Sequence, residues 1–351
     1  MLIEENKPLA PYTTFGIGGP ARWFVEAASE DEIVEATGWA QARGLPLFVL
    51  GGGSNLLVAD EGFDGLVLRV ALLGIEAYAD GPAGDAFGEW VYRVAAGEGW
   101  DHFVGRTTKD NCAGLECLAG IPGTVGGTPV QNVGAYGKEV ASAIERVRVF
   151  DLAQREFVEL SAAECGFAYR RSRFNSTDRG LYIVTRVNYR LPLGGAPTLR
   201  YADLKQYFEQ SGHEPSLAEV AATVRRVRQA KGMLLIEGDP DCRSAGSFFK
   251  NPVVSEELAG QIAAGSDKEP PRFPAGPGLV KVPAAWLIEQ AGFARGYALG
   301  RAGVSSRHTL ALINRGGASA EEVLALAEEI GAAIKAKFGV RLEMEPVLVG
   351  F

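Results

Sequence analysis

Histidine and cysteine, the usual ligands of transition metals, are scarce in this chain. It has three histidines and four cysteines among 351 residues, and the cysteines stand at positions 112, 117, 165 and 242. No two of them form Cys-x-x-Cys, and no Cys/His spacing matches a zinc site. The sequence therefore predicts no metal centre, and unpaired thiols are typical of the reducing cytosol.

Long apolar runs and basic clusters are also missing. No segment is apolar over the ~20 residues that cross a bilayer, and the acidic, polar residues 1–8 do not resemble a signal peptide. The formal net charge is −8, and no basic tract could neutralise a nucleic-acid backbone. We therefore expect a cytoplasmic, monomeric protein without membrane insertion or nucleic-acid partners.

The patterns that are present predict an α+β protein of two or three domains, because 351 residues exceed one ordinary core. Capping boxes begin three predicted helices, at Ser29, Ser216 and Ser319, and a fourth covers residues 283–292. Short β-branched or alternating runs predict strands at residues 47–50, 66–70, 91–95, 147–150 and 183–191. Residues 194–212 are interpreted as a bridge between domains, and the proline-rich residues 265–278 as an exposed loop.

Glycine is abundant, with 45 residues, and it concentrates in two loops. The first, Gly51-Gly52-Gly53-Ser54-Asn55, directly follows a predicted strand. Consecutive glycines allow several N–H groups to point at one spot, which suits phosphate oxygens. The same residues also suit a tight hairpin turn, so this loop alone leaves both interpretations open.

The second loop, residues 120–137, contains six glycines in eighteen residues and is a poor helix or strand former. It has neither the Gly-x-Gly-x-x-Gly fingerprint of dinucleotide-binding folds nor Gly-Lys-Ser/Thr. An irregular surface loop is the alternative, although so much glycine is costly to order. Two such loops in one strand-rich half favour a single long anionic ligand, and a dinucleotide flavin has a suitable shape and charge.

Seven motifs, in order from residue 6 to the C-terminus, resemble the UDP-N-acetylenolpyruvoylglucosamine reductase (UDP-N-acetylmuramate dehydrogenase) family. They are Asn-x-x-Leu-x-x-Tyr-Thr-Thr-Phe-Gly-Ile, Leu-Gly-Gly-Gly-Ser-Asn-Leu, Gly-Ile-Pro-Gly-Thr-Val-Gly, Gln-Asn-x-Gly-Ala-Tyr-Gly, Tyr169-Arg170-x-Ser172-x-Phe174, Gly-Ser247-Phe-Phe-Lys-Asn-Pro and Leu-Glu-Met-Glu345. The resemblance implies an FAD-binding fold of the vanillyl-alcohol-oxidase type with two α+β subdomains, residues 1–70 and 71–212. An α+β substrate-binding domain over residues 213–339 would follow, and residues 340–351 would return near the active site.

The resemblance also implies non-covalent FAD, NADPH as hydride donor, and reduction of an enolpyruvyl ether of UDP-N-acetylglucosamine to UDP-N-acetylmuramate, a peptidoglycan precursor. The two substrates would use one site in turn. The residues implied to bind FAD are Gly51, Gly52, Gly53, Ser54, Asn55, Gly120, Pro122, Gly123, Gly126, Gly127, Asn132, Gly134, Ala135 and Tyr136. A flavin oxidase with covalent FAD is a weak rival, because residues 44–65 contain no His or Cys that could form the bond.

The resemblance assigns the chemistry to three residues: Arg170 and Glu345 would stabilise an enediolate, and Ser247 would protonate carbon. A guanidinium suits a carboxylate, and on a strand Arg170 would face away from Arg171 and Arg173. Ser247 would need help from neighbours such as Lys250 or Asn251, and its sequence context fits a turn or helix-cap serine equally well.

Glu345 would help only if it is protonated or hydrogen-bonded, so we expect burial to raise its pKa. Glu343 competes for the role, because on a strand both residues would share a face. One departure from the family is plain. Val347 stands where a basic residue is common, so either another cation substitutes or that contact is missing.

The resemblance assigns the UDP part of the substrate to several polar residues, and Tyr201 matches the loop tyrosine of the subtype that closes over the substrate. The implied substrate-binding residues are Tyr201, Arg228, Lys231, Asn251, Lys281, Arg295 and His308. Alone, each is weak: Lys231 could serve a helix dipole, and His308 could be an ordinary buried imidazole. Intact Arg170, Ser247 and Glu345 argue against the other rival, a non-catalytic nucleotide-sugar binder.

Overall fold

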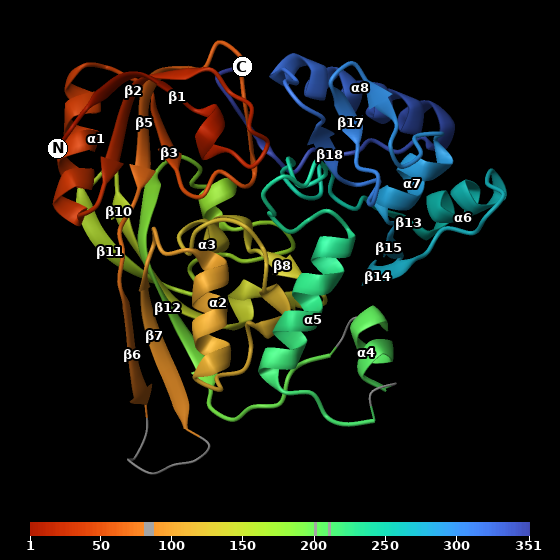
Figure 1. Ribbon diagram of the computed structural model, residues 1–351, viewed down its shortest axis with the longest axis horizontal. Helices are drawn as coiled ribbons and strands as arrows, with labels where there is room; N and C mark the ends of the chain where they lie inside the picture. The colour runs from red at the N-terminus through yellow and green to blue at the C-terminus, as the bar shows by residue number, and fades with distance from the viewer. Residues whose placement is uncertain (81–87, 200–201, 210–211) are drawn as a thin grey trace. The chain divides into compact units, whose positions relative to one another are not determined.

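The computed structural model describes residues 1–80, 88–199, 202–209 and 212–351 (Figure 1). The chain divides into two compact units, each assembled from three segments. Unit 1 comprises Met1–Lys7, Arg22–Gly52 and Asp64–Arg228, and unit 2 comprises Pro8–Ala21, Gly53–Phe63 and Gln229–Phe351. The predicted division near residues 70, 212 and 339 stays a prediction.

Two larger sheets supply most strands of unit 1. The first has the order β1 (Glu4–Pro8), β2 (Pro20–Ala27), β5 (Phe63–Val70) and β3 (Leu47–Leu50). The second is antiparallel, in the order β11 (Glu156–Ser161), β10 (Ile144–Asp151), β12 (Tyr182–Pro192), β7 (Glu89–Ala95) and β6 (Ile75–Asp80). All five strands predicted from the sequence are confirmed within these sheets.

The α-helices of unit 1 are α1 (Glu30–Ala42), α2 (Trp100–Lys109), α3 (Gly127–Gln131), α4 (Ala202–Glu209) and α5 (Leu217–Ala230), whose last two residues lie beyond the unit boundary. Helix α2 lies against the five-stranded sheet (Figure 1), and its Phe103 ring stands 4.9 Å from Tyr189 of β12 and 5.6 Å from Tyr92 of β7. These rings are fully buried. Packing of aromatic rings therefore fixes the helix that precedes the second glycine loop.

Unit 2 is built from short strands and three helices. One sheet has the order β13 (Val253–Ser255), β15 (Leu279–Lys281) and β14 (Phe273–Gly276), and a second has the order β16 (Ala298–Leu299), β17 (Ala302–Val304) and β18 (Leu312–Asn314). In a third sheet, β4 (Leu56–Val58) and β19 (Val347–Val349) pair in parallel. Its helices are α6 (Glu256–Ala264), α7 (Ala284–Gln290) and α8 (Ala320–Phe338). Helix α8 packs against β17 and β18.

The structure confirms the α+β class and the four predicted helices, but it corrects two segments. Residues 265–278 are not only a loop, because Phe273–Gly276 forms β14. Pro274 is tolerated there because β14 is an edge strand with a register shift beside it. Residues 194–212 contain α4, which the sequence pattern did not reveal. No helix in the described part of the chain is long and apolar enough to span a membrane.

Candidate active site

The two predicted glycine loops touch each other in unit 1. A Cβ atom on Gly52 would lie 2.5 Å from Gly123 Cα, and one on Gly51 would lie 3.0 Å from Thr124 Oγ1. Side chains at these positions would force the two backbones apart. The close approach of the two loops explains why both are glycine at this point.

The rest of the first loop belongs to unit 2, since the unit boundary falls between Gly52 and Gly53. Gly53 has a positive φ of 63°, and a Cβ there would lie 1.7 Å from Tyr12 O. Asn55 Nδ2 donates to Glu345 O at 3.1 Å, and the Val347 N–H donates to Asn55 O. Within unit 2, the first glycine loop is thus bound to the C-terminal segment that carries Glu345.

The glycine loops fit an anionic dinucleotide. The Thr124 hydroxyl oxygen beside Gly51 is buried and has no hydrogen-bond partner among the described residues. Within the same described part of the chain, the N–H groups of residues 52–55 donate no hydrogen bond. Donors on a backbone without Cβ atoms are suited to phosphate oxygens. Within unit 1, Gly51, Gly52 and Thr124 would hold a diphosphate-bearing part of FAD.

The second loop is more regular than expected, because it contains α3 and the short hairpin of β8 (Gly134–Ala135) and β9 (Lys138–Glu139). Asn132 ends α3 in the left-handed conformation, with φ of 42°. Its amide is used within the protein: Nδ2 donates to Glu139 Oε2 and Ala168 O, and Oδ1 accepts from the Ala141 N–H. The fully buried Asn132 side chain therefore holds together segments of unit 1.

Arg170 lies in a tight turn, and the strand assumed for residues 170–173 is wrong. Ala168 and Arg171 exchange two backbone hydrogen bonds, and Arg170 has a φ of 53°. The short helix η4 (Arg173–Asn175) follows. The turn, and not strand alternation, sets the direction of Arg170.

Arg173 and Arg170 have different surroundings. Arg173 forms an ion pair with Asp178 at 2.5 Å and donates to Glu164 O, so it has a structural role. The Arg170 guanidinium lies beside the β8 backbone: Nη1 is 3.4 Å from the place where a Cβ of Gly134 would be. Arg170 is thus adjacent to the predicted flavin-binding loop within unit 1.

Ser247 and Glu345 are brought near each other in unit 2 by a single antiparallel bridge, Phe249 to Met344. The Glu345 N–H donates to Phe248 O at 2.8 Å. Ser247 is half-buried, and its hydroxyl makes no hydrogen bond to another described residue. It is therefore not a helix-cap serine in this structure.

The competing carboxylate, Glu343, forms an ion pair with Lys250 at 2.5 Å and is 71% exposed. Lys250, considered as a helper of Ser247, thus has a carboxylate partner. The other considered helper, Asn251, accepts from the Ala284 N–H at the start of α7. The raised pKa expected for Glu345 stays a prediction, and Val347 begins β19.

The residues predicted to bind substrate fall into separate groups. Arg228 is buried in unit 1, where its Nε donates to Gly120 O at 2.9 Å and its side chain hydrogen-bonds to Tyr136. Burial lowers its pKa. It therefore contacts the second glycine loop. Tyr201 lies outside the described residues.

The charges of Lys231 and Arg295 act on His308 within unit 2. Burial lowers the pKa of His308 to about 4, and the charges of Lys231 and Arg295 add to this shift. His308 is therefore neutral near pH 7. Two cationic side chains that act on a third, nitrogen-bearing one could bind an anionic group such as a diphosphate. Lys281 lies on β15 of the same unit.

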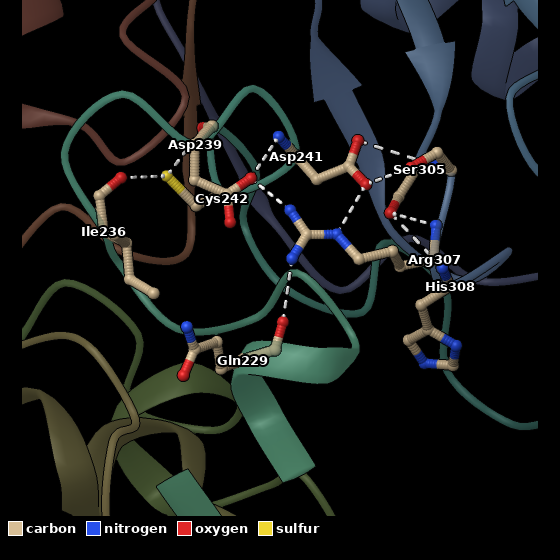
Figure 2. Close-up of polar contacts among 9 residues, drawn as sticks. Gln229, Ile236, Asp239, Asp241, Cys242, Ser305, Arg307 and His308 are labelled. Carbon is tan, nitrogen blue, oxygen red and sulfur yellow. Dashed lines mark hydrogen bonds and ion pairs between the residues drawn. The ribbon is translucent and has the colours of Figure 1, made fainter. Parts of the chain in front are cut away.

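Sequence reasoning missed the charged network that holds this region. Figure 2 shows Arg307 between Asp239 and Asp241, while the His308 ring points away from them. Arg307 Nε lies 3.0 Å from Asp241 Oδ2, and Nη1 donates to Gln229 O. Burial opposes ionisation of Asp241, but hydrogen bonds from Ser306 and Arg307 keep its pKa below the usual range. The only feature of the sequence that pointed to Arg307 is its position next to His308, a predicted substrate-binding residue.

The pKa of His308 predicts a pH-dependent stability. The unfolded chain would bind one more proton than the folded chain between the ordinary histidine pKa of about 6.5 and the folded value. Stabilisation is thus present above about pH 6.5 and is lost as the pH falls towards 4. We expect the free energy of unfolding to lose about 1–2 kcal/mol between pH 7 and pH 5 from this group.

Urea unfolding of the parent chain and of His308→Gln at both pH values measures this loss. The variant should lack it, whereas the same change at His102, which is 74% exposed, should leave the pH dependence as in the parent. An equal loss in the parent and His308→Gln would contradict the assignment.

Comparison with known proteins supports both the predicted FAD-binding half and the predicted C-terminal domain. Residues 21–161 match an FAD binding domain, and residues 239–349 match the C-terminal domain of UDP-N-acetylenolpyruvoylglucosamine reductase. The chain is 46% identical to the UDP-N-acetylenolpyruvoylglucosamine reductase of Thermobifida fusca, over 99% of this chain and 98% of that protein. The protein of the same name from Streptomyces coelicolor is also 46% identical, with 99% and 90% covered.

A solved structure gives the same result. The crystal structure of UDP-N-acetylenolpyruvylglucosamine reductase from Thermus caldophilus matches with a TM-score of 0.66 and 29% identity, covering 99% of each chain. The predicted arrangement, an FAD-binding half followed by a C-terminal α+β domain, is confirmed. The molecule is an oxidoreductase with FAD as its cofactor, and the chain belongs to the UDP-N-acetylenolpyruvoylglucosamine reductase family.

Proposed function

We propose that this enzyme reduces UDP-N-acetyl-enolpyruvylglucosamine to UDP-N-acetylmuramate with NADPH, in the synthesis of peptidoglycan precursors. The observation that carries the proposal is the 46% identity to reductases of that name over nearly the whole of both chains. The presence of Arg170, Ser247 and Glu345 supports a catalytic chain over a nucleotide-sugar binder.

The reaction saturates a C=C bond conjugated to a carboxylate. Bound FAD would supply the hydride for the β carbon. Negative charge then moves onto the carboxylate as an enediolate, and Arg170 would stabilise it through two parallel hydrogen bonds. Ser247 would donate the proton that the α carbon needs. Its hydroxyl makes no hydrogen bond to another residue that the structure describes, and it lies near the Glu345 backbone; both are compatible with this role.

Glu345 would assist as a protonated or hydrogen-bonded group, because a bare carboxylate would repel the enediolate. The exposed ion pair of Glu343 with Lys250 favours Glu345 for this role. The UDP diphosphate would meet Lys231, Arg295 and neutral His308, whose pKa is lowered in part by the charges of the other two. Asn251, Lys281 and Tyr201 remain proposed contacts. Arg228 does too, although its bond to Gly120 favours the flavin side.

An absorbance spectrum and an NADPH oxidation assay of the purified protein test the proposal. We expect a flavin spectrum, loss of the yellow colour from the protein on acid precipitation, and NADPH oxidation that depends on the UDP-enolpyruvyl sugar. Equal oxidation with and without that sugar would argue for another oxidoreductase activity. No oxidation in either case would favour a nucleotide-sugar binder, and flavin that stays with the precipitate would indicate covalent attachment.

A further inference from the structure

Arg170 has a backbone conformation that its surroundings must maintain. Its φ of 53° lies in the left-handed region, which is strained for a non-glycine residue. The Ala168 N–H donates to Arg171 O at 2.9 Å, and the Arg171 N–H donates to Ala168 O at 3.0 Å. Tyr169 and Arg170 therefore form the two-residue tip of the turn.

Two asparagine side chains hold this tip from inside unit 1. Asn175 Nδ2 donates to Arg170 O at 3.2 Å, and Asn132 Nδ2 donates to Ala168 O at 2.9 Å. Asn175 also reaches α3, because its Nδ2 lies 3.3 Å from Gln131 Oε1. The carbonyl groups at both ends of the tip are thereby tied to α3 and to the residue that ends it.

Asn175 has a second contact that stabilises its own position. Its Oδ1 accepts from the Ser172 N–H at 2.9 Å, which completes the capping box of η4. Ser172 is fully buried, and its hydroxyl donates to Val130 O at 2.7 Å. The Asn175 amide is thus oriented by a buried anchor, with its NH₂ group directed at Arg170 O.

We propose that Asn175 is a positioning residue for Arg170. By donating to the Arg170 carbonyl, it maintains the left-handed turn from which the guanidinium reaches the substrate carboxylate. The inference rests on the proposed function, in which Arg170 binds that carboxylate. Two parallel hydrogen bonds need accurate geometry, and a misplacement of about 1 Å can cost roughly 10²-fold in rate.

Asn175→Asp removes the hydrogen bond to Arg170 O but keeps the one that completes the capping box. The remaining carboxylate can still accept from the Ser172 N–H, but it cannot donate to Arg170 O. We expect the enolpyruvyl substrate to reoxidise the reduced enzyme about 10- to 100-fold more slowly. FAD content and the rate of reduction by NADPH should remain within about twofold of the parent enzyme, since none of the residues implied to bind FAD is substituted.

Two further variants exclude simpler explanations. Asn175→Ala removes the amide without adding charge and should slow the same half-reaction. Asn111→Asp makes the identical change at an exposed asparagine of unit 1 that also has a positive φ, of 56°, and both half-reactions should stay at parent rates. If only Asn175→Asp is slow, the added charge is responsible and the inference is wrong.

A double-mutant cycle with Arg170→Ala is the decisive measurement. If Asn175 acts through Arg170, Asn175→Asp will cause no further slowing in the Arg170→Ala enzyme. Independent, multiplying losses would overturn the inference. So would an impaired Arg170→Ala enzyme beside unimpaired Asn175 variants, which would leave the proposed function standing. An Arg170→Ala enzyme with parent kinetics would overturn both the proposed role of Arg170 and this inference.

Discussion

We expect Ser247→Ala to slow reoxidation of the reduced enzyme by the enolpyruvyl substrate at least about 10²-fold, because general acid catalysis contributes roughly 10²–10⁴-fold. Reduction of the enzyme by NADPH should stay nearly unchanged, since that half-reaction transfers no proton to carbon. The half-buried Ser247 hydroxyl makes no hydrogen bond to another described residue, so within that part of the chain the substitution breaks no side-chain hydrogen bond. Stopped-flow absorbance of the flavin resolves the two half-reactions.

Ser266→Ala is a suitable control for this experiment. It removes the same group from another serine of unit 2, whose hydroxyl donates only to Ile262 O at the end of α6. Both half-reactions of this control should match the parent enzyme. If Ser247→Ala does the same, the proton must come from another donor.

The second large effect concerns stability. Arg307→Ala should lower the free energy of unfolding by about 2–4 kcal/mol, because it leaves two partly buried carboxylates without their cation. The side chains of Asp239 and Asp241 are 13% and 5% exposed, whereas that of Arg307 is 30% exposed. Because Arg307 is partly exposed, we expect a smaller loss of stability than for a fully buried ion pair. Urea unfolding at pH 7 measures the change.

The matched control is Arg22→Ala, which breaks an ion pair with Asp64 of 2.9 Å. Its side chains are 54% and 84% exposed, so its loss should cost less than about 1 kcal/mol. Hydrogen–deuterium exchange should show faster exchange at residues 229–246 and 305–308 in Arg307→Ala. Equal destabilisation by the two variants would show that burial of the Arg307 network contributes nothing extra.

The elements that could be predicted from the sequence are those with local signals. In α8, the Ser319 capping box, the apolar stripe and Gly339 with its positive φ all lie within one segment, and the structure confirms each. The Ser29 signal also marks a helix start, although Glu32 accepts from the Ala28 N–H and not from that of Ser29. Capping and periodicity need no knowledge of distant residues, so they can be recognised without a structure.

What could not be predicted depends on contacts between distant segments. Asp241 and Arg307 are 66 positions apart, and neither has a local signal that names the other. No glycine marks the left-handed turn at Arg170, so residues 170–173 were expected to be extended. Strand β14 exists only because β15 pairs with it. Asn175 did have a faint signal, since Ser172-x-x-Asn175 has the spacing of a capping box.

The same difference between local signals and long-range contacts applies to the candidate site. Motif similarity named Ser247 and Glu345, but their proximity depends on the bridge from Phe249 to Met344 and on Asn55. Motif similarity also placed Asn132 among the flavin ligands, which stays a prediction, and the structure shows that its side-chain amide is hydrogen-bonded within unit 1. A motif identifies which residues matter, and only the fold shows which of their atoms are free to act.

The interleaved units restrict how this protein can be dissected. The chain passes between them at residues 7/8, 21/22, 52/53, 63/64 and 228/229, so no single cut separates one from the other. A fragment of residues 229–351 would lack β4, the partner of β19, and the buried Phe15, Ile17 and Leu57 of its core. A chimera of two relatives joined at residue 228 would mismatch these same positions. Exchanging unit 2 between members of this family therefore requires that its three chain segments be exchanged together.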